Sequence, residues 1–429
     1  MKQAIVVLLL CAAWAAPGQP SNGPVVLHAA RMLDVAAGKV SSPGEVLVQG
    51  ERIIAVGEHV DRPAGAQVID LGDRTLMPGL IDAHVHLFLH PGAEDMQTVR
   101  ESVPDRTILA VLAAKADLMA GFTAERDMGT EGAHSADSAV RDAIDAGLIP
   151  GPRLRVSGNA IDVLGGHEDA IAFNPAAHVP SNADFANGAE ELVRVMRQQH
   201  KEGSDFAKIY ETGPDVLVDG ELKTPYQYSE TELKAAVAEM ARLAAGSSSP
   251  MGVAVHCTGE PAASYAVSAG VASIDHAYFL SDPTMQEMKA KQIFAVPTFA
   301  IMEYFAAHAL SPEAGARQKA LQDFHAAQFK RQLAAGVPFA VGSDVGPFPH
   351  GTQARELELM VQFGMAPADV LRADLLNGAR LLGWGGQMGE LKPGYFADVI
   401  AVDGDPLKDI SSLTKVRFVM KGGAVYRQP

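Results

Sequence analysis

Short apolar runs alternate with longer amphipathic stretches through the middle of the chain, between residues 78 and 387. Apolar runs of about four to eight residues predict buried strands, and segments with a helical period lie between them. Such alternation is typical of a closed (β/α)8 TIM barrel, more than of an open doubly wound sheet. The predicted strands are Leu80–His86, Phe122–Asp127, Arg153–Ser157, Phe206–Glu211, Gly252–His256, Ala272–His276, Ile293–Pro297 and Pro338–Asp344.

Local signals mark the boundaries of several helices between these strands. Ser229 and Glu232 have the spacing of a capping box, which predicts a helix that begins there and runs to about Ala245. Ser311 followed by Pro312 predicts another start, because proline is favoured at the first helical position. The helical segment 138–147 is expected to end at its terminal glycine.

Both ends of the chain have a different pattern, with short alternating strands separated by turns. Residues 24–77 and 388–429 contain such runs, including Val46–Val48, Arg52–Val56 and Val416–Met420. We expect these two segments to form one small composite β-sandwich domain beside the α/β barrel of residues 78–387. The first barrel strand is not followed by a Gly-x-Gly-x-x-Gly motif, so nothing favours a dinucleotide site.

The first 18 residues have the organisation of a secretory signal peptide. Lys2 precedes an apolar run from Ala4 to Ala16, which is too short to span a bilayer, and Ala13–Ala15 offers a small-x-small cleavage motif. Cys11 follows a leucine where a lipoprotein signal has a small residue. We therefore expect export to the periplasm or the medium, with soluble release and no membrane anchor.

The formal net charge of −16 argues against a nucleic-acid partner, because phosphate binding requires a basic face. The chain has two cysteines, Cys11 and Cys257. Cleavage of the signal peptide would remove the first, so no disulfide is expected in the mature chain. Cys257 directly follows His256, but we expect it to be a small buried side chain and not a nucleophile.

Polar side chains stand at or near the carboxyl ends of five predicted strands, where TIM barrels carry their active sites. His84 and His86 are two residues apart on one strand, which places both imidazoles on the same face. Any of these residues alone has an ordinary structural explanation, but together they have ligand chemistry suited to zinc. The six side chains are His84, His86, Lys208, His256, His276 and Asp344.

Several segments resemble the amidohydrolase superfamily over nearly the whole mature chain. Residues 78–86 resemble its opening motif, and the order His-x-His, Lys, His, His, Asp resembles its binuclear metal subtype. Other segments resemble the branch with Xaa-Pro dipeptidases, imidazolonepropionase-like proteins and ochratoxin-cleaving amidohydrolases. They are residues 141–153, 165–167, 349–351, 377–383 and 394–398.

The resemblance implies a role for each strand-end residue. His84, His86 and Asp344 would bind a buried metal ion, while His256 and His276 would bind a more exposed one. Lys208 would be carbamylated and bridge the two divalent ions, for which zinc is the default. A metal-bridging hydroxide would attack the substrate carbonyl, with Asp344 transferring its proton to the leaving amine.

The resemblance also suggests residues that contact substrate. His167 follows two glycines in the loop after the third strand and would bind the substrate carboxylate or the transition state. Many relatives have an aromatic residue where this chain has Thr258, so the substrate-binding role at that position involves a different side chain. We expect a small-molecule amide or dipeptide as substrate, and assembly of the chain into a homo-oligomer.

Three functions remain open from the sequence. The first is hydrolysis of an N-acyl amino acid, a Xaa-Pro-like dipeptide or an ochratoxin-like amide. The second is a mononuclear deaminase or an imidazolonepropionase-like hydrolase, which would lack the lysine of Lys208 and place a glutamate where Gly259 stands, one residue before Glu260. The third is a non-catalytic scaffold, which the complete ligand set argues against.

Overall fold

The computed structural model describes residues 23–429, except for 170, 172, 175 and 248–250. The predicted signal peptide, residues 1–18, lies outside this part of the chain, so its expected cleavage remains a prediction. Among the described residues, no helix combines the length and the apolar character that crossing a membrane would require.

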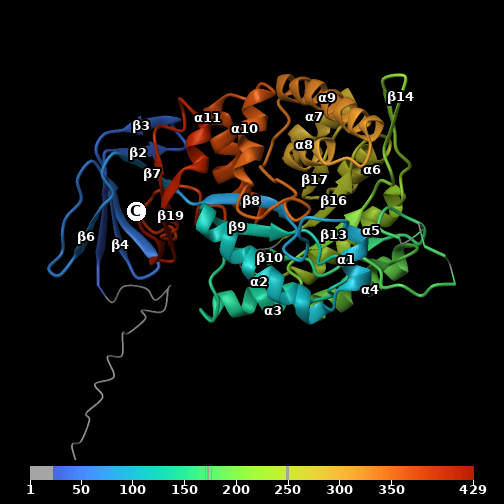
Figure 1. Cartoon of the computed structure of the whole chain (residues 1–429), viewed down its shortest axis with the longest axis horizontal. Coiled ribbons are helices and arrows are strands. Elements are labelled where there is room, and N and C mark those ends of the chain that lie inside the picture. The colour runs from blue at the N-terminus through green and yellow to red at the C-terminus, as the bar shows by residue number, and fades with distance from the viewer. Residues whose placement is uncertain (1–22, 170, 172, 175, 248–250) are drawn as a thin grey trace, which may run out of the picture.

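Strands from both ends of the chain form two sheets at one end of the molecule, at the left of Figure 1. The first has the order β5–β4–β1–β6, with bounds Arg52–Gly57, Gly44–Gln49, Val25–Ala29 and Gln67–Asp70. The second has the order β21–β20–β19–β7–β2–β3, with bounds Ala424–Arg427, Val416–Lys421, Val399–Asp403, Arg74–Pro78, Arg31–Asp34 and Lys39–Ser41. Buried side chains of both sheets share one apolar core, which confirms the predicted sandwich.

Pairing between β7 and β19 joins the two ends of the chain in this sandwich. The strands are antiparallel, with Met77 opposite Ile400 and Pro78 opposite Val399. After Pro78 the chain continues through Gly79 directly into the first barrel strand, β8. The sandwich is therefore fixed to the start of the barrel, with no long linker between them.

Parallel strands form the wall of the barrel, to the right of the sandwich in Figure 1. The regular strands are β8 (Leu80–Val85), β9 (Phe122–Asp127), β10 (Arg153–Val156), β11 (Ala160–Asp162), β13 (Ala207–Tyr210), β16 (Val253–Cys257), β17 (Ser273–His276) and β18 (Phe294–Val296). The third predicted strand corresponds to β10, and β11 is an additional strand that the sequence did not predict; Gly158 with φ 74° breaks the extended conformation between them.

The eighth predicted strand, Pro338–Asp344, is not a regular strand, yet it closes the barrel. Phe339 bridges to Ala295 of β18, and Val345 bridges to Val85 of β8. A Cβ atom at Gly342 would lie 2.7 Å from Cβ of His84, so glycine is what permits this close approach. The irregular segment thus holds the adjacent Asp344 close to the end of β8.

Helices surround the barrel, and the capping signals mark their ends as predicted. Ser229 and Glu232 form the complete capping box of α5, and Ser311 caps α9. The helix predicted at 138–147 is α3, which starts two residues earlier than expected. The helices are α1 (Glu94–Arg100), α2 (Val103–Ala120), α3 (Ala136–Asp145), α4 (Ala189–Lys201), α5 (Glu230–Leu243), α6 (Ala262–Ala269), α7 (Asp282–Lys291), α8 (Phe299–Ala307), α9 (Pro312–Ala335), α10 (Ala354–Gln362), α11 (Pro367–Leu371), a π-helical turn (Arg372–Asn377), α12 (Gly378–Leu381) and a 3-10 turn (Ile410–Thr414).

Three short strands lie outside the barrel wall. β12 (Ala183–Phe185) pairs with β11, while β14 (Val216–Val218) and β15 (Glu221–Lys223) form a hairpin after β13. This hairpin projects at the upper right of Figure 1. The hairpin follows β13, the strand that contains the predicted ligand Lys208.

Candidate active site

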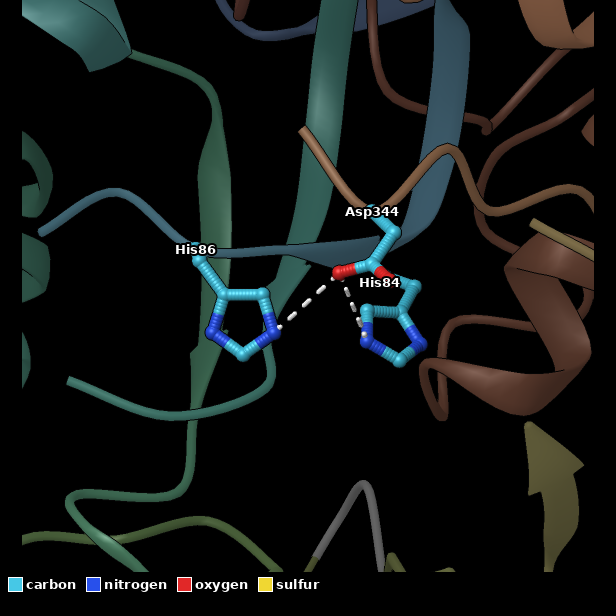
Figure 2. Close-up of side chains that lie close together, drawn as sticks. All are labelled: His84, His86 and Asp344. Atoms are coloured by element: carbon cyan, nitrogen blue, oxygen red, sulfur yellow. Dashed lines mark ion pairs between the residues drawn. The ribbon is translucent and has the colours of Figure 1, made fainter. Parts of the chain in front are cut away.

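Two imidazoles and a carboxylate meet at the end of the first barrel strand (Figure 2). Nε2 of His84 and Nε2 of His86 each lie 3.4 Å from Oδ1 of Asp344. All three residues offer ligand atoms within 4.8 Å of one another, which is close enough to hold one metal ion. Asp344 has a φ of 62°, a left-handed conformation that is rare for residues other than glycine and concentrates at functional sites.

The other three predicted ligands line the same cavity, which has a volume of about 330 Å³. The ring centroids of His256 and His276 lie 4.4 Å apart, and those of His84 and His276 lie 5.2 Å apart. Nε2 of His256 is buried without a hydrogen-bond partner among the described residues. The fold thus brings all six predicted ligand residues to the rim of one cavity.

Neighbouring polar groups contact the Nδ1 atoms of three of these imidazoles and orient the rings. Nδ1 of His86 lies 3.0 Å from the carbonyl oxygen of Gly129, and Nδ1 of His276 lies 2.8 Å from Oγ1 of Thr298. Nδ1 of His84 lies 3.4 Å from Oδ1 of Asp275. Metal-binding histidines are oriented by such contacts on the nitrogen that does not bind the ion. The donor set therefore fits a metal centre.

Burial favours the neutral form of most of these bases. It lowers the pKa of His256 and His276 well below the usual range and that of His84 to about 4. A neutral imidazole has the free lone pair that a metal ion needs. His86 is the exception: burial opposes protonation, but the carboxylates of Asp344 and Glu131 outweigh it and raise the pKa. A metal ion would compete with that proton for the ring nitrogen.

Lys208 has surroundings unlike those of an ordinary lysine. Its side chain is 1% exposed and lines the cavity. Within the described part of the chain, its Nζ atom makes neither a hydrogen bond nor an ion pair, although it lies 5.2 Å from the centroid of the Tyr210 ring. Burial lowers the pKa of this amine. Burying a charged amine without a partner costs free energy, unless a further group binds it or it becomes neutral.

A buried ion pair supports the metal centre from inside the barrel. Arg126 donates to Oδ1 of Asp275 at 3.0 Å and also to the carbonyl oxygen of Ala83 and to Oγ of Ser273. Burial tends to raise the pKa of Asp275, but Arg126 and His84 reverse that effect and lower it. This carboxylate therefore stays anionic behind His84.

We expect Arg126→Met to destabilise the protein by about 3–5 kcal/mol, because it leaves the buried charge of Asp275 without its partner. Urea unfolding followed by circular dichroism measures the loss. The double variant Arg126→Met/Asp275→Leu is the control, since removing both charges should recover part of the stability. A loss below about 1 kcal/mol in the single variant would contradict the supporting role of this pair.

His167 enters the cavity from the loop after β11, as predicted for a residue near the substrate. Its ring stacks on Tyr210 with centroids 5.0 Å apart and an interplanar angle of 10°. Its centroid also lies 4.3 Å from that of His256. The backbone N–H of His167 donates to Oε1 of Gln227 at 2.8 Å, which fixes the loop. His167 thus stands beside the predicted ligands.

The structure places Thr258 differently from the expectation that it contacts substrate. Its side chain is fully buried and is not part of the cavity lining. Its hydroxyl instead donates to Oδ1 of Asp215 at 2.5 Å, and Asp215 does line the cavity. The adjacent Cys257 is also fully buried, and burial raises the pKa of its thiol, as expected for a structural cysteine.

Several lining residues were missed by sequence reasoning, because no recognisable motif marks them in the sequence. Glu131 has a φ of 49°, and Oε1 of its side chain lies 3.2 Å from Nδ1 of His86. The remaining lining comes from other loops and from α8 and α9. The further residues missed are Glu94, Glu168, Asp215, Gln318 and Leu321.

Comparisons with known proteins show which family has this sequence and fold. Residues 75–426 match the Amidohydrolase family. The chain is 30% identical over 382 residues to an ochratoxinase of Aspergillus niger, covering 82% of this chain and 76% of the relative. It is 23% identical to an imidazolonepropionase of Geobacillus kaustophilus, covering 94% and 97%. A crystal structure of a Xaa-Pro dipeptidase with bound methionine superposes with a TM-score of 0.84 at 28% identity, covering 94% of this chain and all of that one. The chain therefore belongs to the amidohydrolase family.

Proposed function

We propose that this protein is a binuclear metal-dependent hydrolase that cleaves an amide bond in a small molecule. The observation that carries the proposal is the buried, unpaired amine of Lys208 on the same cavity as five other candidate metal ligands. The candidate substrates are N-acyl amino acids, dipeptides of the Xaa-Pro kind and ochratoxin-like amides. The names of the similar proteins support this range of substrates.

The residues present fit two metal ions. His84, His86 and Asp344 would hold one ion, and His256 with His276 would hold the other. An ammonium group has no lone pair and repels cations. A neutral lysine amine can instead add carbon dioxide and release a proton, which leaves a carbamate whose single negative charge is shared by two oxygens. Burial, which lowers the pKa of Lys208, favours the neutral amine that this addition requires. Zinc suits this set of nitrogen and oxygen ligands.

When bound, the two ions would lower the pKa of a water molecule and polarise the scissile carbonyl. The chain's own groups then have defined tasks. Asp344, held between His84 and His86, would accept a proton on a carboxylate oxygen and return it to the leaving nitrogen. His167, stacked on Tyr210 at the cavity, would position the substrate. No protein nucleophile is required.

The geometry around Glu260 argues against the deaminase alternative. A deaminase of this fold would use a glutamate near His256 as its proton carrier. Oε1 of Glu260 accepts from the backbone N–H of Ser281 and from the hydroxyl of Thr284, and Glu260 is not among the residues that line the cavity. Its carboxylate thus fixes the start of α7. The presence of all six ligand residues on one cavity likewise argues against a scaffold without activity.

Metal analysis combined with turnover on one substrate panel tests the proposal. We expect about two divalent ions per chain and cleavage of at least one class among N-acyl amino acids, Xaa-Pro and other dipeptides, and ochratoxin A. Release of the free amine identifies the leaving group. Removal of metal by a chelator should abolish turnover, and added zinc should restore it. Full activity in metal-free protein would overturn the proposal.

A further inference from the structure

The charged side chains on the cavity are unevenly distributed. The proposed metal ligands include one cation, Lys208, and one carboxylate, Asp344. When these ligands are set aside, all the remaining charged side chains on the described lining are acidic, and none comes from arginine or a second lysine. The four acidic residues are Glu94, Glu131, Glu168 and Asp215. Burial raises the pKa of Glu168 well above its usual range but that of Asp215 only to about 6, so Asp215 still carries a negative charge at neutral pH.

Asp215 is held in place by hydroxyl groups. Oγ1 of Thr258 donates to Oδ1 of Asp215 at 2.5 Å and lies 3.1 Å from Oγ1 of Thr212 and 3.3 Å from Oγ1 of Thr224. Thr212 and Thr258 are both fully buried. Neutral hydroxyls orient a carboxylate without cancelling its charge. Within the described residues, no lysine, arginine or histidine forms an ion pair with Asp215.

Asp215 and the candidate metal ligands line one cavity, so a substrate bound at the ligands shares that cavity with Asp215. Tyr278 lines the same cavity. Tyr278 packs against His276 with ring centroids 6.0 Å apart. The part of a substrate that lies beyond its scissile carbonyl therefore has Asp215 among the side chains available to it.

Apolar side chains form another part of the same lining. Ile301, Met302 and Phe305 come from α8, and Leu321 comes from α9. A substrate that fits both parts has an apolar portion and a positive charge. A substrate carboxylate placed beside Asp215 would be repelled by the charge of Asp215 and would lose its hydration, which is unfavourable.

We infer that the cavity selects amide substrates that carry a protonated amine or guanidinium group, and that Asp215 binds this cation. The inference rests on the proposed function for the cleavage step, but it concerns the recognition of substrate and not the chemistry. Asp215 is then a specificity-determining residue, and Thr258 is a positioning residue that acts through it. A carboxylate kept in place without a cation is suited to binding one supplied by a ligand.

Matched substrate pairs test the inference with the zinc-loaded protein. One pair places the charge on the leaving group, with Nα-acetyl-lysine against Nα-acetyl-norleucine. The other places it on the acyl group, with 6-aminohexanoyl-glycine against heptanoyl-glycine. We expect the cationic member of at least one pair to have a kcat/KM about 10-fold higher or more. Asp215→Asn should reduce that preference to within about twofold, because it lowers kcat/KM for the cationic member.

Asp219→Asn is the control, because this exposed residue of the β14–β15 turn loses the same charge at φ 51°, a conformation that asparagine tolerates. It should keep the preference. Thr258→Val should weaken the preference in the same direction, because Asp215 loses the hydroxyl that orients it. Equal kcat/KM values within both pairs, or a preference unchanged in Asp215→Asn, would overturn the inference while leaving the proposed hydrolase intact.

If none of these amides is cleaved, the proposed function fails on its own, and binding still decides the inference. Calorimetric titration of the same pairs should then give tighter binding of the cationic member to the wild type, with the difference lost in Asp215→Asn. Equal affinities would overturn the inference. Circular dichroism and metal content verify that each variant is folded and loaded.

Discussion

Replacing Lys208 with alanine is expected to lower turnover of any cleaved amide by about 10³-fold or more, because a metal ion contributes several kcal/mol to the transition state. The variant loses the amine that would form the bridging carbamate, so its metal content should fall below that of the wild type. Among the described residues that line the cavity, no other lysine could take the place of Lys208. Metal analysis and steady-state kinetics on the same preparations measure both effects.

Lys201→Ala is the matched control, since this residue ends α4 on an exposed surface. It should keep both the metal content and the activity of the wild type. Protein prepared without metal and depleted of carbon dioxide provides a second check. Zinc alone should then restore little activity, and zinc with bicarbonate should restore it fully. A Lys208→Ala variant with wild-type metal content and turnover would exclude the carbamate bridge.

Replacing Asp344 with asparagine is expected to lower kcat by about 10²–10⁴-fold, the usual contribution of a positioned proton carrier. Asparagine keeps the shape and one oxygen, so the loss should exceed what the accompanying decrease in metal affinity explains. Burial tends to raise the pKa of Asp344, but His84 and His86 reverse this and keep the carboxylate anionic. The variant removes that anion without emptying the space.

Kinetics at saturating zinc separate the two effects in Asp344→Asn. With metal content restored, kcat should remain low while KM changes little, as expected for an interaction used in the transition state. Asp61→Asn, on an exposed loop of the sandwich, is the control and should behave as wild type. Full recovery of kcat by zinc would reduce Asp344 to a metal ligand and assign proton transfer to another group.

The positions of the candidate ligands were predictable because barrel geometry fixes them. Parallel strands end on the same rim, so His84, His256 and His276 converge wherever the exact strand boundaries lie. Two-residue spacing decided that His86 shares a face with His84. The eighth strand was less predictable. The residues around Gly342 and Asp344 run along the barrel wall without regular β-sheet pairing, and a run of apolar residues in the sequence does not distinguish such a segment from a fully paired strand.

The lining of the cavity could not be predicted to the same extent. Asp215 reaches the cavity through the loop and hairpin after β13, and its orientation depends on the hydroxyl of Thr258, from a different strand. Glu131 approaches His86 only because its backbone adopts a positive φ. These placements depend on loop conformations and contacts distant in the sequence, which hydrophobic periodicity does not encode. The hydrogen bond from Thr258 to Asp215 is of this kind, since it joins residues 43 positions apart.

The pairing of β7 with β19 has a consequence for how the polypeptide reaches its native state. Met77 and Ile400 are about 320 residues apart in the sequence, so β7 emerges from the ribosome long before its neighbour exists. The early strands have to remain unaggregated with an open edge while the barrel is synthesised. Fragments that end before residue 399 should therefore be prone to association. Folding of the sandwich should be completed last, after the C-terminal strands arrive.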